Sequence, residues 1–338
     1  MLNVAINGFG RIGRNFLRAF LQDKKAQKKI RVVAINIGSA QLDAVAHMFK
    51  YDTLLGMYPG NVCVNKQELH YELQVDGYTI CIISETDPEK VHWHKYDIDW
   101  VVDATGKFTY RDGAQLHIDS GAKKVLITAP AKDDDVTIIP GVNDSDYDAS
   151  YHNIVSLGSC TTNALAPVLK VLHKNFGILH AFMTTIHAYT NTQVLLDVER
   201  KDLRRARAAA LNIIPTTTGA TKVIGKIMPE LGGRIGGTAV RVPVGKVSLI
   251  DLTFTAKKEI TSESINKAFE HVCQKSLKNI LDISFCPLVS SDYSANNNSV
   301  VIDGLLTAVN GNMGNVFGWY DNEWGYSVRL KDFLISVA

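Results

Sequence analysis

Three glycines stand close to the amino terminus, in the run Gly8-Phe9-Gly10-Arg11-Ile12-Gly13. The run follows a short apolar segment, Asn3–Ile6, and leads into apolar residues at helical spacing over Ile12–Leu21. In this context glycines permit a tight turn and bring the backbone close to a pyrophosphate at the amino end of the helix. A second apolar run, Arg31–Ile35, completes the order of strand, helix and strand. We therefore predict a dinucleotide site in this part of the chain.

The first third of the chain continues this alternation of apolar runs and helical patterns, as a parallel sheet with crossover helices requires. After Cys160, strand patterns outnumber helical ones, which favours a mostly antiparallel sheet. The expected fold class is α/β, with a Rossmann-type doubly wound parallel sheet followed by an α+β domain with a mostly antiparallel sheet. Further strands are predicted at Tyr78–Ile83, Asp99–Val102, Lys124–Ile127, Ala181–Thr185, Thr238–Val242, Ser248–Thr255, Val300–Ile302 and Val316–Trp319, and further helices at Leu42–Phe49 and Ser262–Val272.

The length of 338 residues suits two domains and allows a sizeable core. We expect a dinucleotide-binding domain at residues 1–159 and a second, catalytic domain at residues 160–320. The last segment, residues 321–338, has apolar residues at helical spacing and is expected to return to the first domain as a helix.

Charge and cysteine usage exclude several classes of function. The formal net charge is only +2, from 36 basic and 34 acidic side chains, so a nucleic-acid partner is not expected. The five cysteines show no paired spacing, which favours a reducing compartment. No signal sequence or membrane-spanning run is evident, and we expect a cytoplasmic protein without a membrane partner. No metal site is expected either, because His92-Trp93-His94 has no partner cluster.

Cys160 is the candidate nucleophile. The run Ser159-Cys160-Thr161-Thr162-Asn163 lies between a predicted strand at Ile154–Val155 and an apolar helical pattern that begins at Ala164. In the first turn of a helix, unpaired backbone N–H groups and the helix dipole favour a thiolate, which attacks carbonyl groups. The alternative is that Cys160 is a buried small residue, as most free cysteines are. This segment alone does not decide between them.

His187 is the candidate partner of that sulfur. It follows the apolar run Met183-Thr184-Thr185-Ile186 and is expected to project from a strand end into a loop. An imidazolium beside Cys160 stabilises a thiolate and later relays a proton, which requires the two side chains to lie close in space. The alternative is a purely structural histidine.

Two further clusters are suited to anions. Hydroxyl groups and flexible backbone meet in Thr216-Thr217-Thr218-Gly219, and Arg241 ends a predicted strand just before Pro243. Arginine offers a planar fork that suits phosphate. The basic stretch Asp202–Arg207 joins this cluster only if it folds inward; otherwise it is a solvated face.

Together these segments resemble the phosphorylating glyceraldehyde-3-phosphate dehydrogenase family. The resemblance is collinear and covers nearly the whole chain. It rests on Asn7–Arg14, Ser159–Asn163, His187-Ala188-Tyr189-Thr190, Thr216–Gly219, Arg241-Val242-Pro243 and Tyr320-Asp321-Asn322-Glu323-Trp324-Gly325-Tyr326-Ser327.

The resemblance implies an NAD(P)-dependent enzyme that oxidises glyceraldehyde 3-phosphate to 1,3-bisphosphoglycerate with inorganic phosphate. Cys160 would attack the aldehyde to give a thiohemiacetal and, after hydride transfer to the cofactor, a thioester that phosphate cleaves. His187 would take the hydroxyl proton as the hydride departs. A homotetramer is also implied.

The remaining site residues also come from the resemblance. Asn322 resembles the residue that holds the nicotinamide carboxamide. The full set of predicted cofactor-binding residues is Asn7, Gly8, Gly10, Arg11, Ile12, Gly13, Ile37, Thr128, Asn322 and Tyr326. The attacking phosphate is assigned to Ser159, Thr161, Thr218 and Gly219, and the substrate phosphate to Thr190, Arg205 and Arg241.

The chain departs from the family where the cofactor's ribose is read. Ile37 stands in place of the aspartate that grips the adenine ribose, and Val198-Glu199 stands where NAD-specific members have Leu-Pro. Arg200 or Ser39 would suit a 2′-phosphate, whereas Glu199 would repel one. NAD is the expected cofactor, with NADP as the alternative.

Two other functions compete with this one. Erythrose-4-phosphate dehydrogenase is a related enzyme with the same nucleophile, but relatives of that type lack the Thr216–Gly219 and His187–Asn191 runs. A non-catalytic protein acting through an exposed surface is the other alternative. Such a protein would not need Cys160, His187 and Arg241 together.

Overall fold

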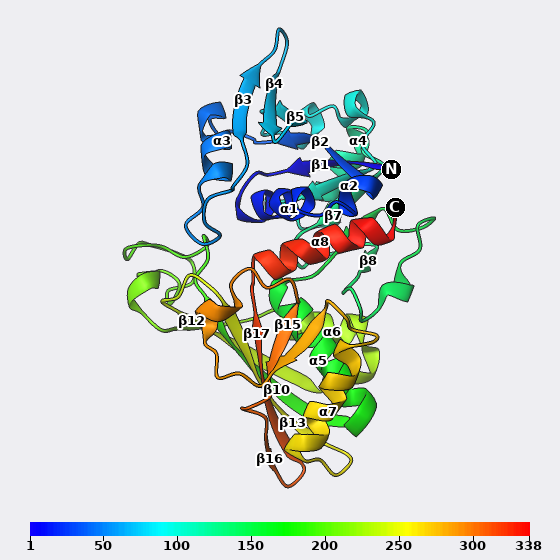
Figure 1. The fold of residues 1–338 in the computed structure, drawn as a ribbon, viewed down its shortest axis with the longest axis vertical. Coiled ribbons are helices and arrows are strands. Elements are labelled where there is room, and N and C mark those ends of the chain that lie inside the picture. Colours follow the sequence, from blue (N-terminus) through cyan, green and yellow to red (C-terminus); the bar gives the residue numbers. More distant parts are fainter. The chain divides into compact units, whose positions relative to one another are not determined.

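A computed structural model describes residues 1–338, which form two compact units, each with its own sheet (Figure 1). Unit 1 comprises Met1–Ile138, Ser145–Gly158 and Ser327–Ala338, and unit 2 comprises Ile139–Asp144 and Ser159–Tyr326. The short segment Ile139–Asp144, which the sequence grouped with the first domain, therefore belongs to unit 2.

Unit 1 contains a nine-stranded sheet in the order β3-β4-β5-β2-β1-β6-β7-β9-β8. Strand β1 lies between β2 and β6 and runs parallel to both, so the chain winds outward in both directions from β1. Only the β3-β4-β5 edge is antiparallel. The strands are β1 (Leu2–Asn7), β2 (Ile30–Asn36), β3 (Val62–Lys66), β4 (Tyr71–Val75), β5 (Tyr78–Ile83), β6 (Trp100–Asp103), β7 (Lys124–Ile127), β8 (Val136–Thr137) and β9 (Ile154–Ser156).

The central strands of unit 1 are buried on both faces. Val4, Ala5 and Ile6 of β1 are fully buried, as their unbroken apolar run requires in a parallel sheet covered on each side. The helices of this unit are α1 (Arg11–Leu21), α2 (Ala26–Lys29), α3 (Leu42–Lys50), α4 (Arg111–Asp119) and α8 (Trp324–Ser336), whose residues from Ser327 onward belong to unit 1.

Unit 2 contains an eight-stranded mixed sheet in the order β11-β12-β10-β13-β17-β15-β14, with β16 paired to β17. Its pairings are antiparallel except β10–β12 and β14–β15. The strands are β10 (Ile178–Ala188), β11 (Ile214–Thr216), β12 (Ile235–Val242), β13 (Ser248–Ala256), β14 (Leu281–Ser284), β15 (Val300–Asp303), β16 (Ala308–Asn310) and β17 (Met313–Tyr320).

The core of unit 2 lies between this sheet and its helices, α5 (Cys160–Phe176), α6 (Ala220–Ile227) and α7 (Ser262–Cys273). Along β13 buried residues alternate with partly exposed ones, so Ile250, Leu252 and Phe254 point toward the helices. Leu165 and Leu169 of α5 complete this core.

The predicted fold class is confirmed, and each strand and helix predicted from the pattern is present. The bounds of β5 and β7 are as predicted, and the ends of the other elements are shifted by a few residues. The sequence missed the β3–β4 hairpin, α4, α6 and several short strands. Helix α4 gave little signal because its sequence, Arg-Asp-Gly-Ala-Gln-Leu-His-Ile-Asp, combines charged residues with an internal glycine.

Candidate active site

Helix α5 begins at Cys160, so the sulfur lies in the first turn, as the sequence predicted. Ser159 is the N-cap residue, and its Oγ accepts a hydrogen bond of 3.0 Å from the backbone N–H of Thr162. The carbonyl of Ser159 accepts hydrogen bonds from the backbone N–H and the side-chain Nδ2 of Asn163. The Ser-Cys-Thr-Thr-Asn sequence thus caps the helix and fixes the position of the cysteine.

His187 faces this sulfur. Its Nε2 lies 3.6 Å from Sγ of Cys160, although the two residues are 27 positions apart in the chain. His187 is the penultimate residue of β10, and its side chain is buried, so it does not project into a loop as the sequence predicted. The register of the sheet turns the ring inward, where it packs edge-on against Tyr320.

Arg241 lies beside His187 because β10 and β12 pair in register at these two residues. Its Nη1 lies 2.7 Å from Nδ1 of His187 and donates a hydrogen bond of 2.9 Å to the carbonyl of Ala188. Nδ1 of His187 is also 2.7 Å from that carbonyl oxygen. The sulfur, the imidazole and the guanidinium therefore form one contiguous cluster.

The charges of this cluster differ from the sequence expectation. Burial and, secondly, the charge of Arg241 lower the pKa of His187 to about 3, so the ring is neutral near pH 7. Burial raises the pKa of the Cys160 thiol, and the charge of Arg241 opposes that shift. The cation that favours a thiolate in this arrangement is therefore Arg241, whereas the sequence pointed to an imidazolium.

Tyr320 connects the start of α5 to the sheet. Its hydroxyl lies 2.9 Å from Oγ1 of Thr161 and 2.8 Å from Oγ1 of Thr185. All three side chains are buried. No sequence pattern assigned a role to Tyr320, and the structure shows that it fixes the residue next to the sulfur. The hydroxyl of Thr161, a predicted phosphate ligand, is engaged in this contact.

Arg205 folds inward to the threonine turn. Its Nε donates a hydrogen bond of 2.9 Å to Oγ1 of Thr216, and it pairs with Asp202 at 3.4 Å. The charge of Arg205 also lowers the pKa of Arg241, after the larger effect of burial. The guanidinium groups of Arg205 and Arg241 therefore repel each other. An anion bound near both would be attracted by both charges and would relieve that repulsion.

The remaining predicted phosphate residues lie in the same unit. Thr218 accepts a hydrogen bond from the backbone N–H of Ala220 at the start of α6. A Cβ built on Gly219 would have no neighbour within 4 Å, so backbone beside the turn is open. Thr190 is partly exposed, and its Oγ1 lies 3.0 Å from Oγ1 of Thr192.

Asn322 is held by a chain of hydrogen bonds. The backbone N–H of Ala188 donates to Oγ of Ser248, which donates in turn to Oδ1 of Asn322 at 2.9 Å. Because Oδ1 of Asn322 accepts from Ser248, the Nδ2 group is the part of the amide that can donate a hydrogen bond to another molecule. Tyr326, the other predicted cofactor residue of unit 2, is buried, and burial followed by the charge of Cys160 raises its pKa.

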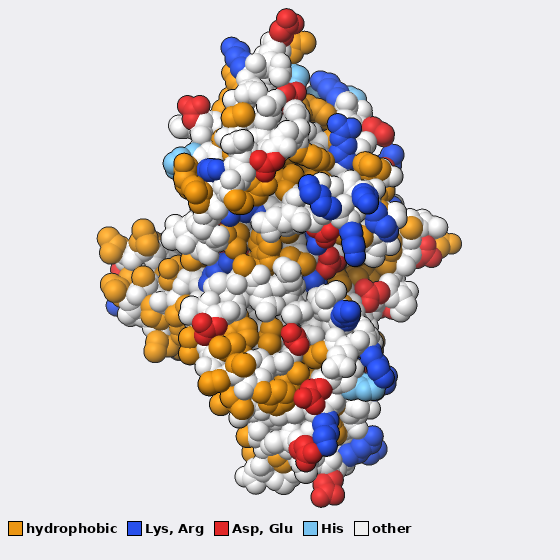
Figure 2. Space-filling view, viewed as in Figure 1, with side chains coloured by type: hydrophobic (Ala, Val, Ile, Leu, Met, Phe, Trp, Pro, Cys, Tyr) orange, Lys and Arg blue, Asp and Glu red, His pale blue; other side chains and the backbone are white.

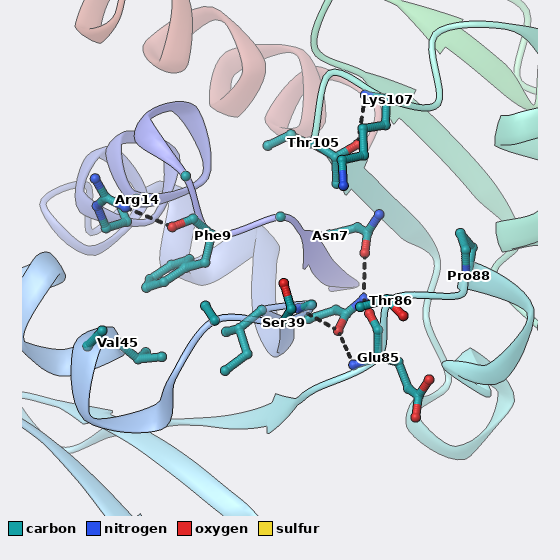
Figure 3. Close-up of a pocket in the computed structure, with 18 of the residues that line it drawn as sticks. Asn7, Phe9, Arg14, Ser39, Val45, Glu85, Thr86, Pro88, Thr105 and Lys107 are labelled. Atoms are coloured by element: carbon teal, nitrogen blue, oxygen red, sulfur yellow. Dashed lines mark hydrogen bonds between the residues drawn. The ribbon is translucent and has the colours of Figure 1, made fainter. Parts of the chain in front are cut away.

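The glycine turn of unit 1 borders a cavity of about 380 Å³ (Figure 3). Gly8 has a φ of +91°, and a Cβ there would lie 2.8 Å from Cγ2 of Thr105. Gly10 caps α1 without a side-chain hydrogen bond, and a Cβ there would meet nothing within 4 Å. Gly10, as the N-cap residue, has no side chain that could accept from the first backbone N–H groups of α1, and the space beside it is open. Such N–H groups can donate to a pyrophosphate, so the cavity fits a dinucleotide.

Four of the predicted cofactor residues line this cavity, namely Asn7, Gly8, Gly10 and Ile37. Arg11 turns away to form an ion pair with Asp52. Three other predicted cofactor residues, Ile12, Gly13 and Thr128, do not line the cavity. Ile12 lies within α1, and Gly13 packs against the Gly8 carbonyl. The hydroxyl of Thr128 donates to the Asp103 carbonyl. Lining residues that the sequence analysis did not assign include Arg14, Glu85, Thr105 and Lys107.

Histidine, cysteine, aspartate and glutamate side chains do not gather in groups of three or more that would ligate a metal ion. None of the helices combines the length and the apolar character that crossing a membrane requires.

The sequence matches two family models. Residues 2–111 match the glyceraldehyde 3-phosphate dehydrogenase NAD binding domain, and residues 159–322 match the glyceraldehyde 3-phosphate dehydrogenase C-terminal domain.

Whole-chain relatives agree with these matches. Glyceraldehyde-3-phosphate dehydrogenase 2 of Bacillus subtilis (strain 168) is 50% identical over 339 residues, which cover 100% of this chain and 97% of that protein. Glyceraldehyde-3-phosphate dehydrogenase 2 of Nostoc sp. (strain PCC 7120) is 47% identical, with 100% and 99% covered. Glyceraldehyde-3-phosphate dehydrogenase of Geobacillus stearothermophilus is 48% identical, with 100% and 98% covered.

Proposed function

The chain belongs to the glyceraldehyde-3-phosphate dehydrogenase family, and we propose that it oxidises glyceraldehyde 3-phosphate with NAD and inorganic phosphate to 1,3-bisphosphoglycerate. The observation that carries this proposal is the 3.6 Å contact between Sγ of Cys160 and Nε2 of His187, with Arg241 on the far side of the ring. A nucleophile, a base and a cation in contact suit covalent catalysis on an aldehyde.

Cys160 forms the covalent bond in this mechanism. Its sulfur adds to the aldehyde carbon, and the proton that the thiol gives up passes through Nε2 of His187 to the carbonyl oxygen, which gives a thiohemiacetal. NAD, when bound, supplies the acceptor for the hydride that leaves this carbon. Nε2 of His187 takes the hydroxyl proton as the carbon becomes a thioester, which requires the proton on Nδ1. An oxygen of inorganic phosphate then attacks the thioester carbon, the C–S bond breaks, and the thiolate is restored.

Two groups of residues bind the two phosphates in this proposal. Arg241, Arg205 and Thr190 hold the substrate phosphate, and the mutual repulsion of the two guanidinium groups supports this role. Ser159, Thr161, Thr218 and Gly219 bind the attacking phosphate, for which the open backbone at Gly219 gives support. Asn7, Gly8, Gly10 and Ile37, which line the cavity of the glycine turn, would hold the cofactor, and the amide of Asn322 would bind its nicotinamide carboxamide.

We further propose that the enzyme can use NADP as well as NAD. Ile37 lines the cavity and brings no carboxylate to repel a 2′-phosphate, and the hydroxyl of Ser39 lines the same cavity. Arg14, whose Nη1 donates to the carbonyl of Phe9, adds a positive charge to the lining. These features support tolerance of NADP alongside NAD. The ratio of kcat/KM for the two cofactors measures it.

We also propose that the protein is a homotetramer located in the cytoplasm. Unit 2 exposes large apolar side chains, which Figure 2 shows as orange areas and which a partner subunit would cover. Among the most exposed are Leu195 (83%), Leu203 (79%), Leu211 (78%) and Leu196 (75%). All five cysteines are free thiols, which suits a reducing compartment. Sedimentation of the purified protein tests the tetramer.

An activity assay with two variants tests the function. The wild-type protein should reduce NAD when given glyceraldehyde 3-phosphate and phosphate, and faster than with erythrose 4-phosphate. Cys160→Ser should lose nearly all of this rate, and His187→Gln should lose about 10²- to 10⁴-fold in kcat. Ser264→Ala, which removes a capping contact of α7, is the matched control and should keep the wild-type rate. Normal turnover by Cys160→Ser would exclude the mechanism.

A further inference from the structure

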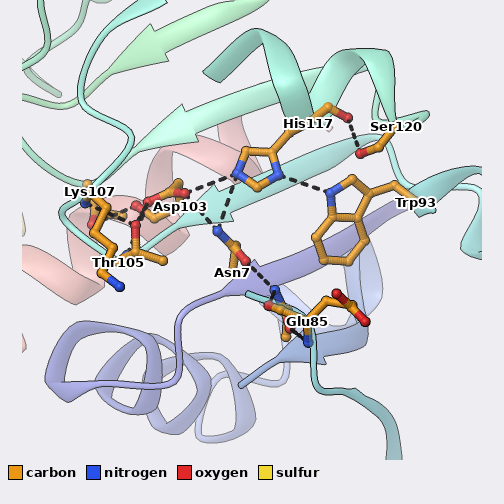
Figure 4. Close-up of polar contacts among 10 residues, drawn as sticks. Asn7, Glu85, Trp93, Asp103, Thr105, Lys107, His117 and Ser120 are labelled. Carbon is orange, nitrogen blue, oxygen red and sulfur yellow. Dashed lines mark hydrogen bonds and ion pairs between the residues drawn. The ribbon is translucent and has the colours of Figure 1, made fainter. Parts of the chain in front are cut away.

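A buried polar network lies next to the glycine turn of unit 1 (Figure 4). Its centre is Asp103, the last residue of β6, whose side chain is buried. Oδ2 of Asp103 accepts hydrogen bonds from Nδ2 of Asn7 at 2.9 Å and from Nε2 of His117 at 3.1 Å. Oδ1 accepts from the backbone N–H and the hydroxyl of Thr105, at 3.0 and 2.7 Å. The carboxylate therefore has two donors on each oxygen.

Trp93 determines where the proton of His117 lies. Its indole Nε1 is 3.1 Å from Nδ1 of His117, and both side chains are fully buried. An indole N–H only donates, so Nδ1 must be the acceptor and the single ring proton must be on Nε2. That proton points at Asp103. The donors and acceptors from Trp93 to Asp103 are thus fixed in one direction.

The network continues from Asn7 into the walls of the cavity. Oδ1 of Asn7 accepts from Nδ2 of Asn36 at 2.8 Å. Oδ1 of Asn36 accepts from the backbone N–H groups of Gly38 and Glu85, and Nδ2 also donates to the Glu85 carbonyl. Figure 3 shows Asn7 and Glu85 on the same side of the cavity, linked by these contacts.

The members of the network divide into two groups. Asn7, Asn36, Gly38, Glu85 and Thr105 line the cavity. Trp93, Asp103 and His117 do not line it. They contact the cavity only through residues that do line it, which are the last residues of β1 and β2 and the loop residues that follow β2, β5 and β6.

We propose that Trp93, His117 and Asp103 are positioning residues that hold these loops in the geometry that binds the dinucleotide. The inference rests on the proposed function, because NAD is the ligand concerned. Binding costs less when the walls of a site are already ordered, so a fully satisfied buried network raises affinity without touching the ligand. Loss of one donor leaves a buried acceptor without its partner, and the loops then gain alternative arrangements.

Substitution of His117 separates positioning from simple stabilisation. His117→Met fills similar space but provides neither the donor for Asp103 nor the acceptor for Trp93. The dissociation constant of NAD, measured by calorimetry on the full chain, should rise about tenfold. The value of kcat at saturating NAD should stay within about twofold, because the reacting groups are untouched. His117→Gln offers an amide NH2 group as the donor for Asp103 and a carbonyl oxygen as the acceptor for Trp93, and should restore the dissociation constant to within about threefold of wild type.

Two further variants complete the test. Trp93→Phe keeps an aromatic ring but removes the indole N–H, so it should fold and weaken NAD binding about threefold. Tyr78→Phe is the matched control, since the Tyr78 hydroxyl accepts a hydrogen bond of 3.0 Å from the Val32 N–H in the same sheet, away from the cavity. It should lower the melting temperature and leave NAD binding unchanged.

The outcomes distinguish this inference from the proposed function. Wild-type NAD affinity in His117→Met, or in Trp93→Phe should the methionine variant not fold, would overturn the positioning role. Equal weakening by Tyr78→Phe and His117→Met would also overturn it, because the effect would then follow stability alone. A wild-type protein that neither binds NAD nor oxidises the substrate would instead refute the proposed function.

Discussion

Nη1 of Arg241 lies 2.7 Å from Nδ1 of His187, and a guanidinium can only donate to that nitrogen. In that contact Nδ1 accepts, which favours the tautomer with the ring proton on Nε2, the nitrogen 3.6 Å from Sγ of Cys160. The carbonyl of Ala188, 2.7 Å from Nδ1, favours the other tautomer, with the proton on Nδ1 and a free lone pair on Nε2. Only the second tautomer takes a proton from substrate. An anion that draws Arg241 away from the ring would favour this second tautomer, because the Ala188 carbonyl would then be the remaining partner of Nδ1.

The depressed pKa of His187 predicts a pH dependence of stability. In the folded state the pKa is about 3, whereas an unfolded histidine has a value near 6.5. As the pH falls below 6.5 the unfolded chain binds a proton that the folded chain does not, so stability present above pH 6.5 is lost toward pH 3. At pH 5 the expected loss is about 2 kcal/mol.

Thermal unfolding of His187→Gln tests this link. The melting temperature of the wild type should fall more between pH 7.5 and pH 5 than that of His187→Gln, which has no titrating ring. Arg241→Gln removes the second cause of the low pKa and should give an intermediate slope. Equal slopes for wild type and His187→Gln would show that the ring is not held neutral by its surroundings.

Local patterns made much of the fold and part of the site predictable. The glycine turn and the cap at Ser159 are encoded within a few residues, so their positions follow from the sequence. The contact between Cys160 and His187 depends on the start of α5 meeting the end of β10, and Arg241 reaches them through the β10–β12 register. Such pairings are set by the tertiary fold, and only the resemblance indicated them.

The network behind the cavity had no sequence signal. Trp93 lies in a short turn and His117 in a helix that the pattern did not reveal, and neither position has a characteristic spacing to Asp103. The direction of the His117 proton also depends on which neighbour faces each ring nitrogen, which only the folded structure provides.

The buried ion pair of Lys246 and Asp321 predicts a large stability effect. Both side chains are almost fully buried, and Nζ lies 2.9 Å from Oδ2. Oδ1 of the same carboxylate accepts from the backbone N–H groups of Glu323 and Trp324 where α8 begins. Lys246→Met should lower the free energy of unfolding by about 3–5 kcal/mol, because it leaves an unpaired buried charge. The double variant Lys246→Met/Asp321→Asn should recover part of the loss; a single variant as stable as wild type would contradict the pairing.

Ser248 is predicted to orient Asn322 for the cofactor. Ser248→Ala removes the donor to Oδ1, so the amide no longer has a fixed direction. The dissociation constant of NAD should rise about fivefold, corresponding to about 1 kcal/mol for one hydrogen bond. Ser264→Ala, which loses a hydrogen bond in the capping box of α7, is the control and should bind NAD normally. Unchanged binding by Ser248→Ala would mean that the amide direction does not matter.

Ile37 gives the sharpest test of cofactor choice, because its side chain lines the cavity with no charge of its own. Ile37→Asp would place a carboxylate where a 2′-phosphate is expected, and should lower the NADP/NAD ratio of kcat/KM about tenfold or more. Ile37→Asn has the same shape without the charge and should change the ratio much less. Because the effect is electrostatic, it should also shrink at high salt. If all three proteins give the same ratio, residue 37 does not read the ribose, and discrimination between the cofactors must come from elsewhere in the site.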